Sequence, residues 1–225
     1  MGDDTERIRI AVADGDQVSA LLKVPPGASS CLVLGHGAGA GMTHPFMAAV
    51  AQGLAERGLA TLRYQFPFME HGSKRPDLPK VAHATVRAAV AEARRCCPDL
   101  PLVAGGKSFG GRMTSQAQAA VAMPGVAGLA FLGFPLHPAG KPSIERAAHL
   151  DAVEVPMLFL QGTRDELADL ALLQPVVERL GARATLHRVD DADHAFHVRA
   201  RSGRTDAEVL GEMLDILAAW TRRWP

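Results

Sequence analysis

Hydrophobic and polar residues alternate in two different ways along this chain. Near the N-terminus, residues 7–12 and 18–24 lie on either side of the polar segment Ala13-Asp14-Gly15-Asp16, which predicts two antiparallel strands joined by a hairpin turn. Further along, short apolar runs are separated by longer segments with helical periodicity. These runs predict strands at residues 31–34, 59–64, 100–104, 126–132, 157–160 and 184–189. The pattern predicts an α/β fold with a mostly parallel sheet of about seven or eight strands.

Helical periodicity and end signals place helices between these strands. The predicted helices cover residues 45–57, 78–97, 109–122, 144–149, 167–180 and 206–223. Thr205 and Glu208 form a capping-box pattern at the start of the last of them. The stretch 133–155, rich in proline and glycine, is too short for a separate lid domain. We therefore expect one domain, residues 1–225, with helices on both faces of the sheet and an open site.

The sequence Gly106-Lys107-Ser108-Phe109-Gly110 stands where a predicted strand gives way to a predicted helix. This is the context of a nucleophile elbow, in which a serine occupies a turn so tight that the residues two before and two after it must be glycine. The turn exposes the Ser108 hydroxyl at the edge of the sheet. It also leaves the Phe109 backbone N–H free at a helix N-terminus, where it can stabilise an oxyanion.

A serine nucleophile needs an imidazole to take its proton and a carboxylate to orient that imidazole. Asp165 follows the predicted strand at 157–160, and His194 follows the last predicted strand at 184–189. Because parallel strands present their carboxyl ends at one edge of the sheet, we expect Ser108, Asp165 and His194 to converge there.

Neighbouring residues offer alternatives for two of these positions. Glu166 is the alternative acid and His197 is the alternative base. Asp193 is expected to cap its own loop, because it adjoins the histidine in sequence and does not follow a separate strand. His36, in the glycine-rich loop after residues 31–34, is interpreted as structural.

That loop reads Gly35-His36-Gly37-Ala38-Gly39-Ala40-Gly41, and its small residues allow backbone N–H groups to approach a ligand. With the elbow and the ordered aspartate and histidine, it makes the chain resemble the small, cap-less members of the α/β-hydrolase superfamily, similar to dienelactone-hydrolase-like proteins. The resemblance extends over nearly the whole chain. It implies that Ser108 is the nucleophile, His194 the base and Asp165 the acid. It further implies an oxyanion hole formed by the backbone N–H groups of Phe109 and of Ala38 or Gly39.

The resemblance implies a serine hydrolase that cleaves a small ester or related acyl bond through an acyl-enzyme. True dienelactone hydrolases carry cysteine at the elbow, whereas this chain has serine, so the lactone substrate is not implied. Two alternatives remain open. The same residues support transfer of the acyl group to an acceptor other than water, and α/β-hydrolase folds also serve as non-catalytic binding or scaffold domains.

Several phenylalanines lie at or just after predicted strand ends, around the candidate triad. Those predicted to bind substrate are Phe66, Phe68, Phe134 and Phe196. They indicate an apolar substrate pocket, the alternative being that the rings complete the top of the core. Lys107 is interpreted as an exposed lysine without a partner, the alternative being that it favours an anionic group on the substrate, and Arg112 is interpreted as structural.

Charge and motif spacing exclude several classes of ligand. The 24 basic residues balance the 24 acidic ones, so the net charge does not support a nucleic-acid or anionic-membrane partner. Gly106-Lys107-Ser108 resembles the end of a phosphate-binding P-loop, but the first glycine of that motif would fall on Pro101, which has no N–H to donate. His194, His197 and the nearby aspartates lack any recognised metal-ligand spacing, and the proposed hydrolysis implies no metal or organic cofactor.

The cysteines and the N-terminal sequence indicate where in the cell the protein is expected. There are three cysteines without the spacing of a disulfide framework, and the acidic N-terminus lacks the features of a signal peptide. No apolar run reaches the length of a bilayer span. We expect a cytoplasmic protein, a monomer or small homo-oligomer, whose partner is a small-molecule acyl substrate.

Overall fold

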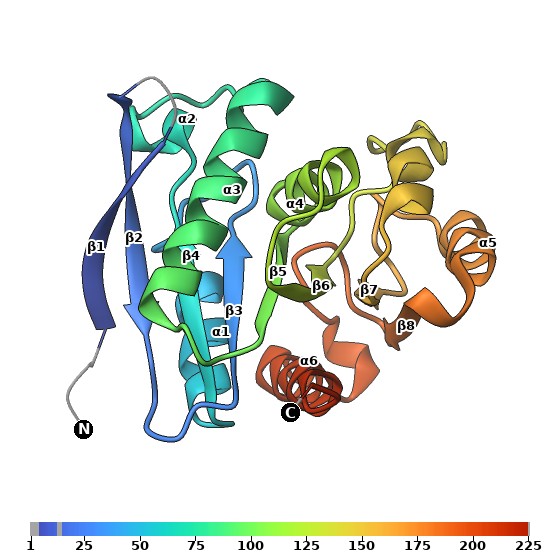
Figure 1. Cartoon of the computed structure of the whole chain (residues 1–225). Coiled ribbons are helices and arrows are strands. Elements are labelled where there is room, and N and C mark those ends of the chain that lie inside the picture. Colours follow the sequence, from blue (N-terminus) through green and yellow to red (C-terminus); the bar gives the residue numbers. More distant parts are fainter. Residues whose placement is uncertain (1–4, 13–14, 225) are drawn as a thin grey trace.

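The computed structural model describes residues 5–12 and 15–224. Its centre is an 8-stranded sheet with the order β1-β2-β4-β3-β5-β6-β7-β8 (Figure 1). The strands are β1 (Thr5–Ala11), β2 (Gln17–Lys23), β3 (Ser30–Gly35), β4 (Leu59–Tyr64), β5 (Leu102–Lys107), β6 (Val126–Leu132), β7 (Met157–Gly162) and β8 (Ala184–Val189). The prediction of an α/β fold with a mostly parallel sheet is confirmed.

The sheet changes from antiparallel to parallel at β4. Strand β1 pairs antiparallel with β2, and β2 pairs antiparallel with β4, whereas every pair from β4 to β8 is parallel. The predicted N-terminal hairpin is therefore present, although residues 13 and 14 of its turn lie outside the described residues. The parallel strands end at a common edge, towards which the β3 arrowhead points in Figure 1.

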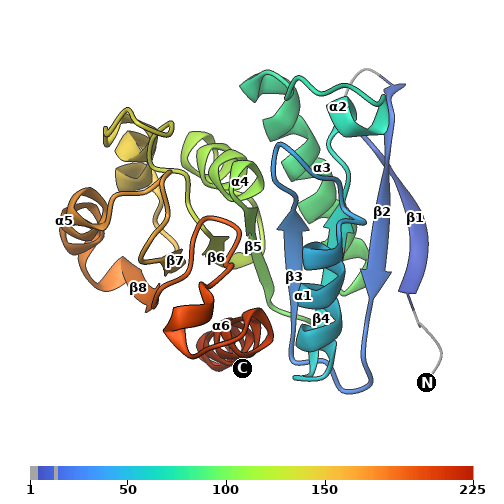
Figure 2. The same cartoon turned by 180° about the vertical axis from the view of Figure 1, so that it is seen from behind.

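Helices cover both faces of the sheet, as predicted. They are α1 (Pro45–Ala55), α2 (Pro67–Glu70), α3 (Pro79–Cys96), α4 (Phe109–Ala120), α5 (Leu170–Leu180) and α6 (Asp206–Thr221), with the 3₁₀ segments η2 (Glu145–Ala152), η3 (Gly181–Arg183) and η4 (Ala200–Ser202). Helices α3, α4 and α5 pack on one face, and α1 and α6 pack on the other (Figure 2). Each face has its own apolar core, so the sheet is buried on both sides.

Several bounds differ from the prediction by a few residues, and the predicted helix at 144–149 is the 3₁₀ segment η2 (Glu145–Ala152). Two further differences have identifiable reasons. Strand β5 continues through Gly105 and Gly106 to Lys107. Position 105 requires glycine, because a side chain there would place Cβ only 1.8 Å from the Ala130 carbonyl oxygen. The apolar run therefore ends before the strand does. The short helix α2 begins with Pro67 at its first position, which suits the fixed φ of proline, and it lies between the predicted strand at 59–64 and the predicted helix at 78–97, where no element was predicted.

The last helix begins as its capping box predicts. The Thr205 side chain accepts from the Glu208 N–H at 3.2 Å, and the Glu208 carboxylate accepts from the Thr205 N–H at 2.7 Å. Within the described part of the chain, no helix is both long and apolar enough to cross a membrane.

Candidate active site

The elbow after β5 holds Ser108 in a strained conformation that its neighbours make possible. Ser108 has φ 51° and ψ −112°, a region that residues other than glycine rarely adopt. A Cβ added at Gly106 would lie 2.3 Å from the Gly35 carbonyl oxygen, and one added at Gly110 would lie 2.4 Å from the same atom. Both glycines are therefore required by close contact with the end of β3, as the elbow motif predicts.

Three side chains from separate loops form one chain of hydrogen bonds at the carboxyl edge of the sheet. The Ser108 Oγ and His194 Nε2 are 2.8 Å apart, and the His194 Nδ1 and Asp165 Oδ2 are 2.7 Å apart. The Asp165 side chain is fully buried, whereas 26% of the His194 side chain is exposed. A hydroxyl linked through an imidazole to a carboxylate is an arrangement that can activate the hydroxyl for nucleophilic attack.

The carboxylate of Asp165 is held by two further donors. The buried Gln161 side chain donates from Nε2 to Asp165 Oδ2 at 2.5 Å, and the Leu167 backbone N–H donates to Oδ1 at 2.8 Å. Gln161 also accepts from the Phe134 N–H at 2.9 Å, so its own orientation is fixed. Sequence reasoning missed Gln161, whose only signal is a polar residue near the end of an otherwise apolar strand.

The alternative acid and base lie outside this chain of hydrogen bonds. Glu166 is exposed, and the His197 imidazole instead pairs with Asp206, with Nδ1 2.9 Å from Oδ2. That hydrogen bond raises the pKa of His197. Asp193 accepts from the N–H groups of Ala195 and His197 at 2.8 and 3.0 Å, which is the loop-capping role expected of it.

The glycine-rich loop after β3 lies beside the elbow. A Cβ added at Gly37 would be 3.9 Å from the Ser108 Cβ, which brings Ala38 and Gly39 close to the serine along the chain. The loop is anchored by His36, whose Nδ1 donates to the Gly37 carbonyl at 2.8 Å while Nε2 accepts from the Phe66 N–H at 3.0 Å. Burial lowers the pKa of His36 to about 4, so its ring is neutral at pH 7.

Lys107 is not the unpartnered exposed lysine that its sequence context indicated. Its side chain is partly buried and donates from Nζ to the His194 carbonyl oxygen at 2.5 Å. The same ammonium lies 5.3 Å from the centroid of the Phe196 ring, a cation–π geometry. Burial lowers the pKa of Lys107 to about 8. Lys107 therefore ties the elbow strand to the loop that carries His194.

The four phenylalanines predicted to bind substrate are buried beneath the rim. Their exposed fractions are 0% for Phe66, 4% for Phe68, 0% for Phe134 and 4% for Phe196. Phe66 and Phe68 pack against Phe109, whereas Phe134 packs against core rings of β6 and β7. Phe196 stacks on Phe46 at a centroid distance of 5.9 Å. Their positions match the alternative in which the rings complete the top of the core.

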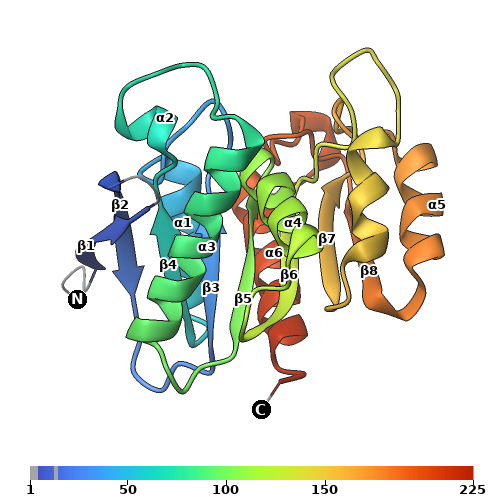
Figure 3. The ribbon, with the colours of Figure 1, turned by 45° about the horizontal axis from the view of Figure 1, so that its top comes forward.

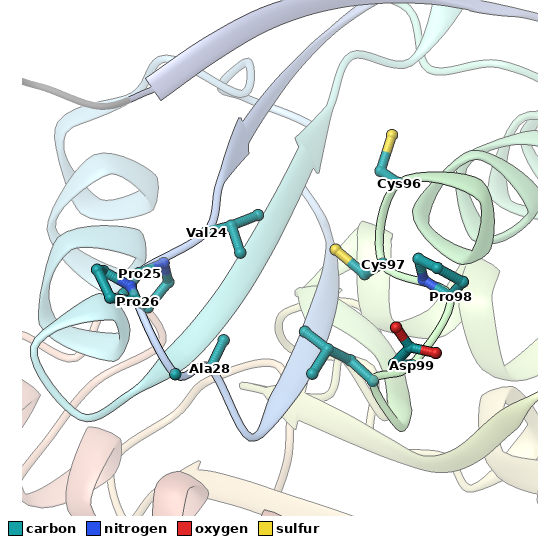
Figure 4. Close-up of a pocket in the computed structure, with 10 residues that line it drawn as sticks. Val24, Pro25, Pro26, Ala28, Cys96, Cys97, Pro98 and Asp99 are labelled. Atoms are coloured by element: carbon teal, nitrogen blue, oxygen red, sulfur yellow. The ribbon is translucent and has the colours of Figure 1, made fainter.

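A depression of about 490 Å³ lies at the opposite end of the strands (Figure 4). Residues 24–28, before β3, and residues 96–100, between α3 and β5, line it. It is thus separate from the edge that holds Ser108. Among the described residues, no group of three or more His, Cys, Asp or Glu side chains could hold a metal ion.

Comparison with known protein families and solved structures shows what the chain as a whole is similar to. A family model described as an alpha/beta hydrolase domain matches residues 28–222. Dienelactone hydrolase from Anabaena variabilis superposes with a TM-score of 0.78 at 20% identity, over 98% of this chain and 97% of that one. An α/β serine hydrolase without a lid from Xanthomonas campestris superposes with a TM-score of 0.74 at 21% identity, over 100% and 96%.

An archaeal enzyme has the same fold. The esterase Pf2001 from Pyrococcus furiosus superposes with a TM-score of 0.76 at 16% identity, over 98% of this chain and 93% of that one. At these identities the superpositions establish the arrangement of strands and helices. The chemistry has to be argued from the side chains of this chain.

Proposed function

Because the chain belongs to the alpha/beta hydrolase family, we propose that it is a serine hydrolase cleaving a small ester or related acyl bond through an acyl-enzyme at Ser108. One observation carries the proposal: the continuous hydrogen-bonded path from Ser108 Oγ through His194 to Asp165, with distances of 2.8 and 2.7 Å. Both lie within the range expected of a nucleophile–base–acid arrangement.

In the first half of the proposed reaction, His194 Nε2 takes the proton of Ser108 as Oγ attacks the acyl carbonyl carbon. The Asp165 carboxylate accepts from Nδ1–H, which fixes the tautomer with Nε2 free and stabilises the imidazolium that forms. His194 then gives its proton to the leaving alcohol as the bond between acyl carbon and alcohol oxygen breaks. The acyl group is left as an ester of Ser108.

In the second half, His194 takes a proton from water as that water attacks the acyl-enzyme. The second tetrahedral intermediate collapses with return of the proton to Ser108, and the carboxylic acid is released. The two half-reactions together need only the protein, the substrate and water.

The negative oxygen of each tetrahedral intermediate requires donors that are already in place. The Phe109 N–H is at the first position of α4, where a helix offers no internal acceptor, and it adjoins Ser108 directly. We assign the second donor to the N–H of Ala38 or Gly39, which the contact of Gly37 with Ser108 supports. The partial positive charge at the start of α4 adds to this stabilisation.

The proposed substrate is a small molecule, and the proposed setting is the cytoplasm. Three unpaired cysteines, Cys31, Cys96 and Cys97, support a reducing compartment. The proposed unit is one domain acting as a monomer or small homo-oligomer, without a metal or organic cofactor.

Replacement of the acid tests the proposed roles. In Asp165→Asn the amide favours the wrong imidazole tautomer, so kcat for a 4-nitrophenyl ester should fall by about 10⁴, the effect of the equivalent change in serine proteases. The matched control is Glu166→Gln, which alters the adjacent exposed carboxylate and should leave kcat within about twofold of wild type. Wild-type turnover in Asp165→Asn, or a large loss only in Glu166→Gln, would remove Asp165 from its proposed role.

A further inference from the structure

Basic side chains from three elements gather around the outer side of α4. Helix α3 supplies His83, α4 supplies Arg112, and η2 supplies Arg146 and His149. Figure 3 shows α4 lying between α3 and the yellow segment that contains η2. The three elements pack together, so these side chains are brought to one surface by the fold and not by sequence proximity.

Neither arginine of this group has an acidic partner. No hydrogen bond or ion pair joins the side chain of Arg112 or Arg146 to another described residue, and the Arg112 Nε is buried without an acceptor. By contrast, Arg57 pairs with Asp215 at 2.7 Å and Arg95 pairs with Glu92 at 2.6 Å. A buried guanidinium donor without an acceptor is unfavourable, and a bound anion would supply one.

Neighbouring positive charges act on three of these side chains. Burial lowers the pKa of Arg112, and the nearby Arg146 guanidinium lowers it further. The pKa of His149 is lowered to about 4 by burial and by the charges of Arg112 and His83. The pKa of His83 is lowered by burial and by Arg87 and Arg112. No carboxylate among the described residues opposes any of these shifts.

Hydrogen bonds hold the edge of this surface in place. Ser115 Oγ donates to the Arg112 carbonyl oxygen at 2.9 Å. Because a serine hydroxyl has one proton, its 2.8 Å contact with His149 Nε2 requires the imidazole to be the donor. His149 is thereby held with Nε2 protonated next to the turn of α4 that carries Arg112. Because its pKa is lowered to about 4, the ring is neutral at pH 7, and the two guanidinium groups remain the charges available to a ligand.

This basic surface lies beside Ser108. The Arg112 backbone N–H donates to the Ser108 carbonyl at 3.1 Å, so Arg112 is one helical turn, or about 6 Å along the axis, beyond the serine. The segment leading to η2 begins at Gly133, where an added Cβ would lie 3.5 Å from the His194 ring. Arg112 is therefore on a helix that begins at the candidate active site, and Arg146 is on the element that packs against this helix.

We propose that Arg112 and Arg146 form a subsite for an oxyanion, a carboxylate or phosphate group carried by the substrate, next to the acyl bond that Ser108 attacks. Guanidinium groups present forked donors that match both anions, and two of them without acidic partners form a receptor with no competing internal ligand. The inference rests on the proposed function and adds a substrate class: small esters that carry a negative charge.

The test compares two esters of the same shape. One is the mono(4-nitrophenyl) ester of glutaric acid, and the other is 4-nitrophenyl 5-methylhexanoate, in which an isopropyl group replaces the carboxylate. The readout is the ratio of their kcat/KM values. Wild type should favour the charged ester, and Arg112→Met and Arg146→Met should each reduce the ratio by about tenfold or more while still hydrolysing the neutral ester.

The matched control is Arg95→Met, which removes an exposed arginine near the C-terminus of α3 and should leave the ratio unchanged. A ratio that stays at the wild-type value in both Arg112→Met and Arg146→Met overturns the subsite. Inhibition by inorganic phosphate or by free glutarate, lost in Arg112→Met, identifies which of the two oxyanions it takes.

The subsite can also be tested if the protein does not hydrolyse esters. If wild type hydrolyses neither ester, the shift in thermal unfolding temperature produced by glutarate and by inorganic phosphate tests the subsite without catalysis. Stabilisation of wild type that is lost in Arg112→Met supports the subsite in a protein that is not an esterase. No stabilisation of folded wild type by either anion overturns it.

Discussion

At the residue scale, Lys107 connects the two sides of the candidate active site. It directly precedes Ser108, and its ammonium donates to the carbonyl of His194 from a position against the Phe196 ring. We infer that it is a positioning residue: it fixes the backbone of the histidine loop and takes no part in proton transfer. Small displacements of reacting groups are costly, because a misplacement of about 1 Å can lower a rate about 100-fold.

A prediction for Lys107 follows from its lowered pKa. The ammonium is charged below about pH 8 and loses its proton as the pH rises through that value, so wild-type kcat should decline on the alkaline side. Lys107→Met should lower kcat by about tenfold or more at pH 7 and should lack this alkaline decline. Rates are measured with 4-nitrophenyl acetate between pH 6 and 9, with Ser108→Ala subtracted as background. Unchanged kcat, or the same alkaline decline in the variant, would contradict the role.

The sequence predicts the three main side chains of the site better than their supporting contacts. Ser108, Asp165 and His194 could be found because each follows a strand in a recognisable order. The hydrogen bond from Lys107 to His194 spans 87 residues, and no local pattern reveals such a partner. The role of Gln161 could not be predicted either, because it depends on the Asp165 carboxylate lying within hydrogen-bond distance of the Gln161 amide at the end of β7.

At the element scale, the contact between the elbow and β3 decides whether Ser108 can occupy its position. Gly106 and Gly110 both approach the Gly35 carbonyl so closely that a methyl group on either would enter the backbone of β3. The apolar pattern predicted the strand and the helix on each side of this turn. It could not predict the strand order, in which β4 lies between β2 and β3, because periodicity contains no information on neighbours.

A pair of glycine substitutions tests the elbow. Gly110→Ala should lower the free energy of unfolding by about 1–3 kcal/mol and lower kcat, because β3 or the turn must move to admit the methyl group. Gly211→Ala, in α6, meets no atom within 4 Å and should raise the free energy of unfolding by about 0.5–1 kcal/mol. Urea unfolding measures both. Gly110→Ala as stable as Gly211→Ala would show that the elbow is not constrained by β3.

The bounds of most strands and helices were predicted to within a few residues. Differences occur where the apolar pattern does not extend over the whole element. Strand β5 extends through Gly105 and Gly106, where close contact with β6 and with the end of β3, respectively, excludes side chains. Helix α2 forms from a single turn that begins at Pro67, too short to show a periodicity. For β5, tertiary contact, which a local pattern does not contain, sets the boundary.

At the scale of the whole molecule, the parallel sheet collects loops from distant parts of the chain at one edge. The elbow, the acid loop and the histidine loop follow β5, β7 and β8, and the glycine-rich loop follows β3. Apolar cores on both faces hold the strands that carry these loops. Rigid strands beneath short loops are an arrangement that keeps reacting groups in a fixed geometry before substrate arrives.

The residues proposed to carry out the reaction and those proposed to select the substrate come from different parts of the fold. Ser108, Asp165 and His194 come from loops at strand ends, whereas Arg112 and Arg146 come from α4 and η2 on one face. Changes to the two arginines should therefore alter substrate choice without preventing acyl transfer to Ser108. Ser108 can therefore be an activated nucleophile even if the two arginines do not bind a charged substrate.

The most direct test of the central claim is labelling with a fluorophosphonate probe, read by intact mass. The probe reacts with serines activated by an imidazole and requires no knowledge of the substrate. We predict that folded wild type gains one probe mass and that Ser108→Ala gains none. Folded wild type that remains unlabelled, or Ser108→Ala that labels as wild type does, would contradict the assignment of Ser108 as the nucleophile.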